Sequence, residues 1–249
     1  MKLTILGCLG AYPHHDEGTT SYLLQAKGYN LLIDCGSMAV SKLEHFVSPL
    51  FVDSVILSHY HHDHIADLGV LQYYRQLWPK DDPNWDGKIL KIWGHKEDKF
   101  HFNDLTLAGV SAGKSYQVGD EKHIGPWNVT FMRTIHPVPC FAMRFEEKAT
   151  GKVFVFTGDS GYLEAFNTFA NDADLFLADT YLFKGHENHK AHLTSYEAGK
   201  IAKTANVKSL VLTHLPQHGD LEQLRQEAKA AAGNKISVEL AIPGRQFEI

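Results

Sequence analysis

The sequence has few cysteines, no long apolar run and no block of like charge. Its three cysteines, Cys8, Cys35 and Cys140, include no CxxC pair, so we expect no disulfide framework. A sparse, odd set of thiols is typical of a reducing compartment, which predicts a cytoplasmic protein. No apolar stretch approaches the roughly 18 residues that a transmembrane helix needs, so the sequence predicts no membrane partner.

Charge of one sign is also lacking. The 24 Lys and Arg residues and 29 Asp and Glu residues give a formal net charge of −5, and the basic residues are scattered. A broad electrostatic footprint for nucleic acid is therefore not visible. With 44% hydrophobic and 21% charged residues over 249 positions, the composition is that of a globular chain. We expect residues 1–249 to form one domain.

Short apolar runs alternate with turn signals and amphipathic stretches. The predicted strands are Leu3–Leu6, Tyr22–Gln25, Leu31–Ile33, Ser54–Leu57, Ile89–Trp93, Thr106–Gly109, Asn128–Ile135, Phe141–Phe145, Val153–Thr157, Leu175–Ala178 and Ser209–Thr213. The predicted helices are Ile65–Leu77, Tyr162–Phe169, Thr194–Ala205 and Leu221–Ala232, the third with a capping box of Thr194 and Glu197. This pattern predicts a mixed α/β domain whose sheet layers are covered by helices.

What the sequence has in excess is histidine, with 16 residues. Four of them fall in one segment, where the apolar run Ser54–Leu57 leads into Ser-His-Tyr-His-His-Asp-His64. Alternate residues in an extended segment point the same way, so His59 and His61 can bind one ion. Asp63 and His64 follow where the chain turns into the next helix, and they can face a second ion. His62 breaks the spacing and is expected to face outward.

A site of this kind needs further ligands, and three later segments offer them. Each places a suitable residue directly after an apolar strand: His136 after Val129–Ile135, Asp159 after Val153–Gly158, and His214 after Ser209–Thr213. Strand ends are where many α/β folds present functional groups. Imidazole suits zinc and its neighbours, and carboxylates neutralise charge. The sequence therefore predicts a metal site assembled from distant segments.

These segments, with Asp34 in Leu-Leu-Ile-Asp-Cys-Gly, resemble the metallo-β-lactamase superfamily in order and context along nearly the whole chain. The resemblance implies an α/β (α+β) fold, the αββα four-layer sandwich, with two divalent metal ions at one edge. Zinc is the first choice of metal, with manganese or iron as alternatives. The implied ligands are His59, His61 and His136 for one ion, Asp63, His64 and His214 for the other, and Asp159 between them. Asp34 would orient the histidine loop through hydrogen bonds.

Within the superfamily, the opening Ile5–Pro13, the segment His136–Phe145 and above all His192–Lys203 resemble ribonuclease Z-like proteins. Those proteins pair a histidine at the place of His192 with a glutamate, and Asp179 occupies that place here. They also carry a long arm that clamps transfer RNA between the third histidine motif and the bridging aspartate. Here His136 and Asp159 are only 23 positions apart, which leaves no room for the arm.

The expected function is that of a metal-dependent hydrolase acting on a phosphodiester, such as a cyclic nucleotide, an RNA end or another small diester. Asp63 would orient the attacking water, and His192, steadied by Asp179, would donate a proton to the leaving oxygen. Three alternatives stay open: transfer-RNA 3′-end cleavage, with the missing arm supplied by the other subunit of a homodimer; thioester or lactone hydrolysis; and a non-catalytic metal-binding module.

The remaining histidines and aromatic residues carry weaker expectations. The histidines at 95, 101, 123, 186, 189 and 218 are expected at the surface, and His14 and His15 lie in a loop that can approach the site. The aromatic residues Tyr60, Tyr73, Tyr74 and Trp78 flank the metal motif. Their helical spacing favours core packing, with a base-stacking wall as the alternative.

Overall fold

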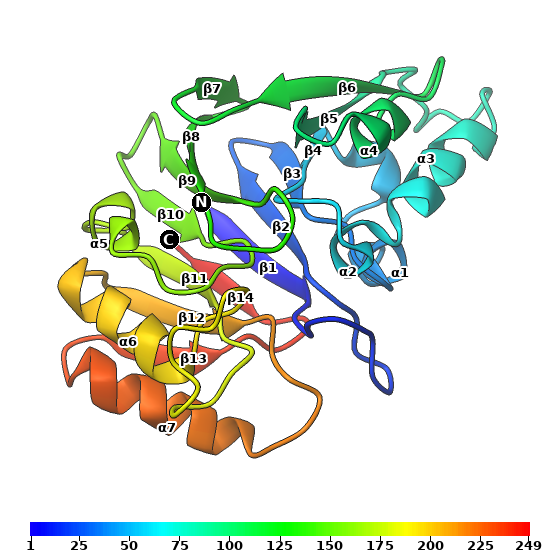
Figure 1. The fold of residues 1–249 in the computed structure, drawn as a ribbon. Coiled ribbons are helices and arrows are strands. Elements are labelled where there is room, and N and C mark those ends of the chain that lie inside the picture. The colour runs from blue at the N-terminus through cyan, green and yellow to red at the C-terminus, as the bar shows by residue number, and fades with distance from the viewer.

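The computed structural model describes all residues from 1 to 249 and confirms the αββα sandwich. Two mixed seven-stranded sheets pack face to face, and helices cover both outer faces (Figure 1). The two chain ends lie side by side, since the backbone N–H of Ile249 donates to the carbonyl oxygen of Met1 at 2.8 Å. None of the helices is long and apolar enough to cross a membrane, and α7, with 12 residues, is the longest.

The first sheet has the order β14-β1-β2-β3-β4-β5-β6. Its strands are β1 (Lys2–Gly7), β2 (Ser21–Ala26), β3 (Tyr29–Ile33), β4 (Ser54–Ile56), β5 (Leu90–His95), β6 (Ser111–Tyr116) and β14 (Gln246–Glu248). β14, β1, β2 and β3 pair antiparallel, whereas β3 to β6 pair parallel. The carboxyl ends of β3, β4 and β5 therefore lie at one edge.

The second sheet repeats this division in the order β13-β12-β11-β10-β9-β8-β7. Its strands are β7 (Glu121–Ile124), β8 (Trp127–Arg133), β9 (Phe141–Glu147), β10 (Val153–Phe156), β11 (Leu175–Asp179), β12 (Ser209–Thr213) and β13 (Ser237–Leu240). β10 to β13 are parallel and β7 to β10 antiparallel. Since β8 and β10 both oppose β9, the carboxyl ends of β8, β10, β11 and β12 share an edge.

The helices divide between the two outer faces (Figure 1). They are α1 (Ala39–Leu43), the short 3₁₀ helix η1 (Pro49–Phe51), α2 (His62–Ile65), α3 (Leu68–Leu77), α4 (Lys99–Asp104), α5 (Ala165–Phe169), α6 (Ser195–Thr204) and α7 (Leu221–Ala232). A smaller apolar cluster lies between the first sheet and α1–α3. The larger cluster fills the space between the two sheets and continues beneath α5, α6 and α7.

Most of the predicted elements are confirmed, and the errors are local. Thr106–Gly109, predicted as a strand, is a turn, and the strand that follows it is β6. Gly109 has a φ of 74°, a value that glycine adopts readily and that ends an extended run. The predicted helix Ile65–Leu77 is divided at Ala66 and Asp67 into α2 and α3. The prediction missed α1, α4, β6, β7, β13 and β14, which are short or carry polar residues.

Candidate metal centre

The residues expected to hold metal come together where strand ends of the two sheets meet. His59 follows β4, His136 follows β8, Asp159 follows β10 and His214 follows β12. The 59–64 segment bends at the start of α2, with His61 at its N-cap. Because each of these residues follows the carboxyl end of a strand, residues separated by up to 155 positions meet in one place.

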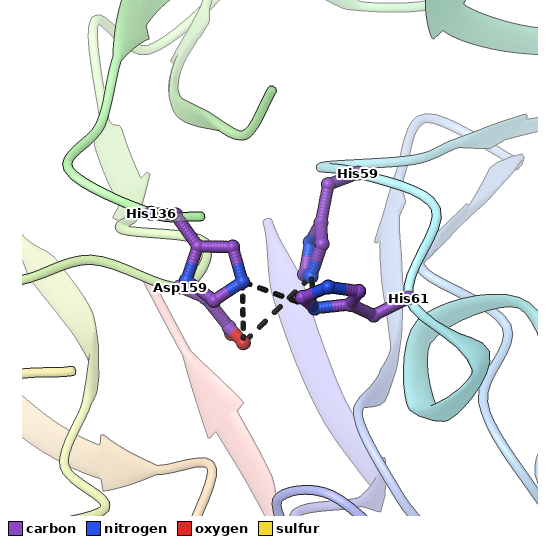
Figure 2. A group of neighbouring side chains, drawn as sticks. All are labelled: His59, His61, His136 and Asp159. Carbon is purple, nitrogen blue, oxygen red and sulfur yellow. Dashed lines mark hydrogen bonds and ion pairs between the residues drawn. The ribbon is translucent and has the colours of Figure 1, made fainter. Parts of the chain in front are cut away.

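One group consists of three histidines and a carboxylate, and the atoms able to bind metal lie within 4.8 Å of one another. Figure 2 shows the rings of His59, His61 and His136 converging from two loops, with Asp159 beside them. The Nδ1 atom of His61 lies 3.0 Å from Nε2 of His59 and 3.0 Å from Nε2 of His136. Tetrahedral ligands about 2.0–2.1 Å from a zinc ion stand about 3.3 Å apart, so these residues fit an ion between them.

A second group lies against the first and consists of Asp63, His64 and His214. Nε2 of His214 is 3.1 Å from Oδ2 of Asp63 and 3.2 Å from Oδ2 of Asp159. The other oxygen of Asp159 is 3.3 Å from Nε2 of His64. Asp159 therefore faces both groups, which is the position expected of a bridging carboxylate.

Asp34 lies beneath the second group and fixes its geometry. Oδ2 of Asp34 accepts a hydrogen bond from Nδ1 of His64 at 2.8 Å, and Oδ1 accepts from the backbone N–H of Ser58 at 2.7 Å. Since the Nδ1 proton of His64 is directed to a carboxylate, its Nε2 atom presents a lone pair to the site. Asp34 and His214 both adopt left-handed backbone conformations, with φ of 54° and 52°. Such strain in non-glycine residues is frequent at functional sites.

Asp179, the last residue of β11, is shared by two histidines. Its Oδ2 atom is 3.0 Å from Nδ1 of His192, and its Oδ1 atom is 3.5 Å from Nδ1 of His214. The backbone N–H of Ser160 also donates to Oδ2 at 3.0 Å. The shorter aspartate at this position therefore still reaches His192. His192 lies beside the candidate ligands, because its ring nitrogen groups with Asp159 and His214 within 4.8 Å.

The electrostatics of the site favour a cation. Burial by itself would lower the pKa of His214, but the carboxylates of Asp159, Asp179 and Asp63 outweigh this effect and raise it to about 10. Burial would likewise raise the pKa of Asp159, yet His214, His64 and His59 hold it well below its usual range. By contrast, burial lowers the pKa of His59, His61 and His136, so these rings are neutral and able to donate lone pairs.

The buried polar atoms at the centre also lack hydrogen-bond partners. Nε2 of His64, Oδ1 of Asp159, Oδ1 of Asp179 and Nδ1 of His214 are all without one. Buried polar groups are almost always satisfied, so a group of unsatisfied ones needs an explanation. A divalent cation satisfies the atoms of His64 and Asp159 that face the centre, and the donor set of imidazole and carboxylate suits zinc, manganese or iron.

One expectation about the other histidines is wrong. His95, expected at the surface, is only 1% exposed, because it ends β5 in the interior of the first sheet and packs beneath Tyr60 and against Phe141. Sequence periodicity gave no sign of this, since a strand's last residue can face either layer. His62 is exposed as expected. His14 contacts His15 and His218, and neither His14 nor His15 belongs to the candidate metal groups.

The flanking aromatic residues have several different environments. Tyr60 is buried, Tyr73 is 62% exposed, and Tyr74 stacks on Trp78 with ring centroids 5.1 Å apart. They do not form one wall beside the metal groups. Tyr60 adjoins the candidate ligand His61. A further aromatic residue, Tyr181, lies on the side of His192, with ring centroids 5.1 Å apart, and the sequence analysis missed it.

Comparison with known proteins gives the same result as the geometry. The family model described as beta-lactamase superfamily domain matches residues 29–215. The chain is 41% identical over 242 residues to the probable metallo-hydrolase YhfI of Bacillus subtilis, covering 96% of each. It is 28% identical over 263 residues to ribonuclease Z of Methanopyrus kandleri, covering 92% of each.

Solved structures extend the comparison. The crystal structure of YhfI from Bacillus subtilis superposes with a TM-score of 0.92 at 40% identity, covering 99% of both chains. The short form of human tRNase Z superposes with a TM-score of 0.76 at 21% identity, covering 100% of this chain and 99% of that one. A diphosphatase of the PhnP family superposes with a TM-score of 0.75 at 17% identity, covering 100% of this chain and 97% of that one.

The similarity to human tRNase Z and to the PhnP-family diphosphatase concerns the fold alone, because the sequence identities are only 21% and 17%. The family model and the relative from Bacillus subtilis are sufficient by themselves, since both span most of the residues that build the site. The expected superfamily is therefore confirmed: the chain belongs to the metallo-β-lactamase superfamily.

Proposed function

We propose that this protein is a metal-dependent hydrolase of phosphodiesters, in which residues 1–249 act as one domain with a dinuclear site. The substrate would be a nucleotide or another small diester. The His192–Asp179 pair carries the proposal, because it places a proton donor beside the candidate metal groups. Relatives described as a metallo-hydrolase and as ribonuclease Z support the same chemistry.

The first ion would be held by His59, His61 and His136, and the second by Asp63, His64 and His214, with Asp159 shared. Bound divalent ions supply Lewis acidity and lower the pKa of water towards neutrality. The chain orients its own ligands for this task. Nδ1 of His136 donates to the carbonyl oxygen of Ala191 at 3.1 Å, so its Nε2 atom faces the site as a lone-pair donor.

Asp63 is placed to orient a water molecule as well as to bind metal. Its Oδ2 atom accepts a hydrogen bond from the backbone N–H of Ala11 at 2.8 Å, which ties the loop after β1 to the site. Burial would raise the pKa of Asp63, but His64 and His214 outweigh it and lower the pKa below the usual range. The carboxylate is therefore ionised at neutral pH and can accept a hydrogen bond from the attacking water, which orients it.

His192 would supply the proton that the leaving oxygen needs. Its Nδ1 proton is held by Asp179, which leaves Nε2 available on the other side of the ring. Burial would lower the pKa of His192, but Asp179 outweighs this effect and raises it. The raised pKa keeps a larger share of the ring protonated near neutral pH, as a general acid requires.

Transfer-RNA 3′-end cleavage is a second candidate, favoured by the 28% identity to ribonuclease Z over 92% of both chains. The structure offers no clamp for that substrate between His136 and Asp159. The chain there forms only β9, a tight turn and β10. Such a function would therefore need an RNA-binding surface from another subunit, for example in a homodimer.

The experiment is hydrolysis of bis(p-nitrophenyl) phosphate by protein loaded with zinc or manganese, with Asp63→Ala as the inactive control. We expect turnover in the wild type and none in the folded variant. Failure of the wild type to turn over with either metal, combined with cleavage of thioesters or lactones, would refute the proposal in favour of acyl chemistry. Inactivity towards both classes would favour a metal-binding module.

The role of His192 is tested by varying the leaving group. An alkoxide needs protonation as it departs, whereas p-nitrophenolate does not. We expect His192→Ala to slow cleavage of a dinucleoside monophosphate about 100-fold or more and to slow release of p-nitrophenolate much less, with bound metal unchanged. Equal losses for both substrates, or loss of metal from the variant, would remove His192 from the general-acid role.

A further inference from the structure

Tyr181 lies two residues beyond the end of β11, and hydrogen bonds on both sides of it fix the backbone there. The backbone N–H of Thr180 donates to the carbonyl oxygen of Thr213 at 2.8 Å, and that of Leu182 donates to the carbonyl oxygen of Leu193 at 3.3 Å. Each acceptor is the direct sequence neighbour of a histidine at the candidate metal centre. The backbone therefore sets the position of Tyr181 relative to both of those histidines.

The ring of Tyr181 packs against the same two histidines. Its centroid is 5.1 Å from that of His192 and 5.7 Å from that of His214, and the two imidazole centroids are 5.0 Å apart. The loop after β1 closes against the ring as well, because a Cβ atom on Gly10 would lie 2.8 Å from Cδ2 of Tyr181. The three rings therefore form one wall of the candidate metal centre.

The hydroxyl group at the end of this ring makes no contact that the fold needs. The side chain is partly buried, yet the hydroxyl has no hydrogen-bond partner within the chain. Unlike Nδ1 of His214, which is also unpartnered, it is not enclosed by protein atoms. A phenol O–H can donate one hydrogen bond and accept others. It is therefore a fixed and accessible donor, available to a bound molecule.

The surroundings of the hydroxyl place it at the mouth of the metal centre. Burial raises the pKa of the Tyr181 hydroxyl, and the ionisable groups that add to this rise are Tyr12 and Asp63. Asp63 is a candidate metal ligand, and Tyr12 is 47% exposed in the loop after β1. The hydroxyl therefore lies on the side of the second candidate metal group. A phenol is protonated at neutral pH, so the group acts there as a neutral donor.

Hydrolysis of a phosphodiester provides a task for such a donor. Water forms a new bond to phosphorus as the bond to the leaving oxygen breaks, and the leaving oxygen takes up a proton, for which His192 is the proposed source. The two non-bridging oxygens keep their bonds and carry negative charge throughout. A preorganised donor directed at such an oxygen stabilises the transition state. Tyr181 and His192 adjoin on one wall, so each can contact a different oxygen of one phosphoryl group.

We propose that Tyr181 contacts the substrate directly, with its hydroxyl donating a hydrogen bond to a non-bridging oxygen of the phosphoryl group. This inference rests on the proposed function, and it adds a residue that neither holds metal nor transfers a proton. The contact differs from a purely supporting role, in which the ring of Tyr181 would only hold His192 in place by packing.

Tyr181→Phe tests the contact, because it removes the hydroxyl and keeps the ring that packs against His192 and His214. We expect kcat of the metal-loaded variant to fall about tenfold or more, with bound metal and Tm unchanged. The loss should be equal for bis(p-nitrophenyl) phosphate and for a dinucleoside monophosphate, since both carry the same non-bridging oxygens. His192→Ala, by contrast, should affect the second substrate far more than the first.

Binding of inorganic phosphate to metal-loaded protein, measured by calorimetry, gives a readout that does not depend on turnover. Loss of one hydrogen bond of ordinary strength should weaken the phosphate affinity of Tyr181→Phe about fivefold. Tyr73→Phe is the matched control, because Tyr73 is 62% exposed on α3 and lies outside the candidate metal groups. The control should leave both kcat and the phosphate affinity unchanged.

Three results would overturn the contact. The first is an unchanged kcat or an unchanged phosphate affinity in Tyr181→Phe. The second is a loss confined to the dinucleoside monophosphate, which would mean that Tyr181 acts only through His192. The third is loss of bound metal, which would mean that Tyr181 acts by packing against His214.

The two proposals fail separately. If the wild type hydrolyses no diester but binds phosphate more tightly than Tyr181→Phe, the contact is supported and the proposed reaction is refuted. If the wild type and Tyr181→Phe hydrolyse diesters at the same rate, the contact alone is refuted.

Discussion

At the scale of single residues, the most informative contact is the carboxylate shared by His192 and His214. Asp179 reaches Nδ1 of both rings, at 3.0 Å and 3.5 Å. One side chain thus links a proposed proton donor to a proposed metal ligand. The sequence predicted the contact with His192 from a family resemblance. The contact with His214 emerges only from the neighbouring positions of β11 and β12.

Asp179→Asn should lower the pKa of the His192 ring. The carboxylate favours the protonated ring, and its removal leaves the opposing effect of burial in place. The pKa should fall by about 1 or more, so the ring loses its proton at a lower pH than in the wild type. NMR titration of the His192 ring in metal-loaded protein measures this. An unchanged titration would show that Asp179 does not control the charge of His192.

Gly10 is a residue whose importance the sequence does not reveal. A Cβ atom there would lie 2.6 Å from Nδ1 of His214 and 2.8 Å from Cδ2 of Tyr181. Gly10→Ala should therefore displace His214 and remove about half or more of the bound metal, with a matching loss of activity. Elemental analysis of the purified variant measures the metal directly.

The matched control is Gly69→Ala, in the first turn of α3, where an added Cβ meets nothing within 4 Å. That change should keep the metal content and stabilise the helix by up to about 1 kcal/mol. If Gly10→Ala kept its full metal content, the close packing around His214 would be shown not to matter for metal binding.

At the scale of elements, the site depends on how strand ends and helix starts are anchored. Thr194 accepts a hydrogen bond from the backbone N–H of Glu197, and the Glu197 side chain accepts from that of Thr194, as the capping box predicts. This fixes the N-cap of α6 at Thr194, two residues after His192. The match was predictable because a capping box depends on residues only three positions apart.

Asp174 anchors the start of β11 against its neighbours. Its carboxylate is 2.9 Å from Nζ of Lys152 and 2.6 Å from Nζ of Lys208, and it accepts from the backbone N–H of Val153. Burial would raise the pKa of Asp174, but these partners outweigh it and lower the pKa from 3.8 to about 2. A lowered pKa in the folded state means that the ionised carboxylate stabilises the fold.

Asp174→Asn should therefore lower the free energy of unfolding by about 1–2 kcal/mol at pH 7. The contribution is complete above the ordinary pKa of 3.8 and disappears as pH falls towards about 2. The wild type and the variant should thus converge between these values. Urea denaturation at pH 7, 4 and 3 measures the difference, with Asp81→Asn in the exposed loop as control. A difference that stayed constant down to pH 3 would contradict this account.

At the scale of the whole molecule, the candidate metal centre draws its residues from both sheets. His59 and His64 belong to the first sheet's loops, whereas His136, Asp159 and His214 follow strands of the second. An ion bound here links both halves of the sandwich, and it binds the folded state only. Metal should therefore stabilise the global fold and not only the loops.

Removal of metal by a chelator should lower the Tm, and added zinc should restore it. A ligand at about 1000 times its Kd stabilises the folded state by about 4 kcal/mol, which corresponds to roughly 10 °C for a chain of this size. Differential scanning calorimetry measures the shift. Asp159→Asn removes the negative charge of the residue that faces both metal-binding groups, so this variant should show a smaller metal-dependent shift in Tm. Identical melting with and without metal would rule out a centre that joins the sheets.

Much of this protein was determined by local sequence. Strands with strong apolar character and the helices α6 and α7 were predicted almost to the residue, because periodicity, caps and stops act over a few positions. The candidate ligands were also visible, since each is a histidine or aspartate placed directly after an apolar strand. Weak elements such as α1, β7 and β14 were missed, because tertiary pairing rather than composition stabilises them.

Only the tertiary structure decided how those residues meet. The order of strands in the two sheets brings Asp179 against His214, leaves no room for a Cβ atom between Gly10 and the same ring, and buries His95 beneath Tyr60. None of these contacts joins residues near one another in sequence. They depend on which strands are neighbours and on the direction in which each strand's last side chain points, and neither property is encoded in a local pattern.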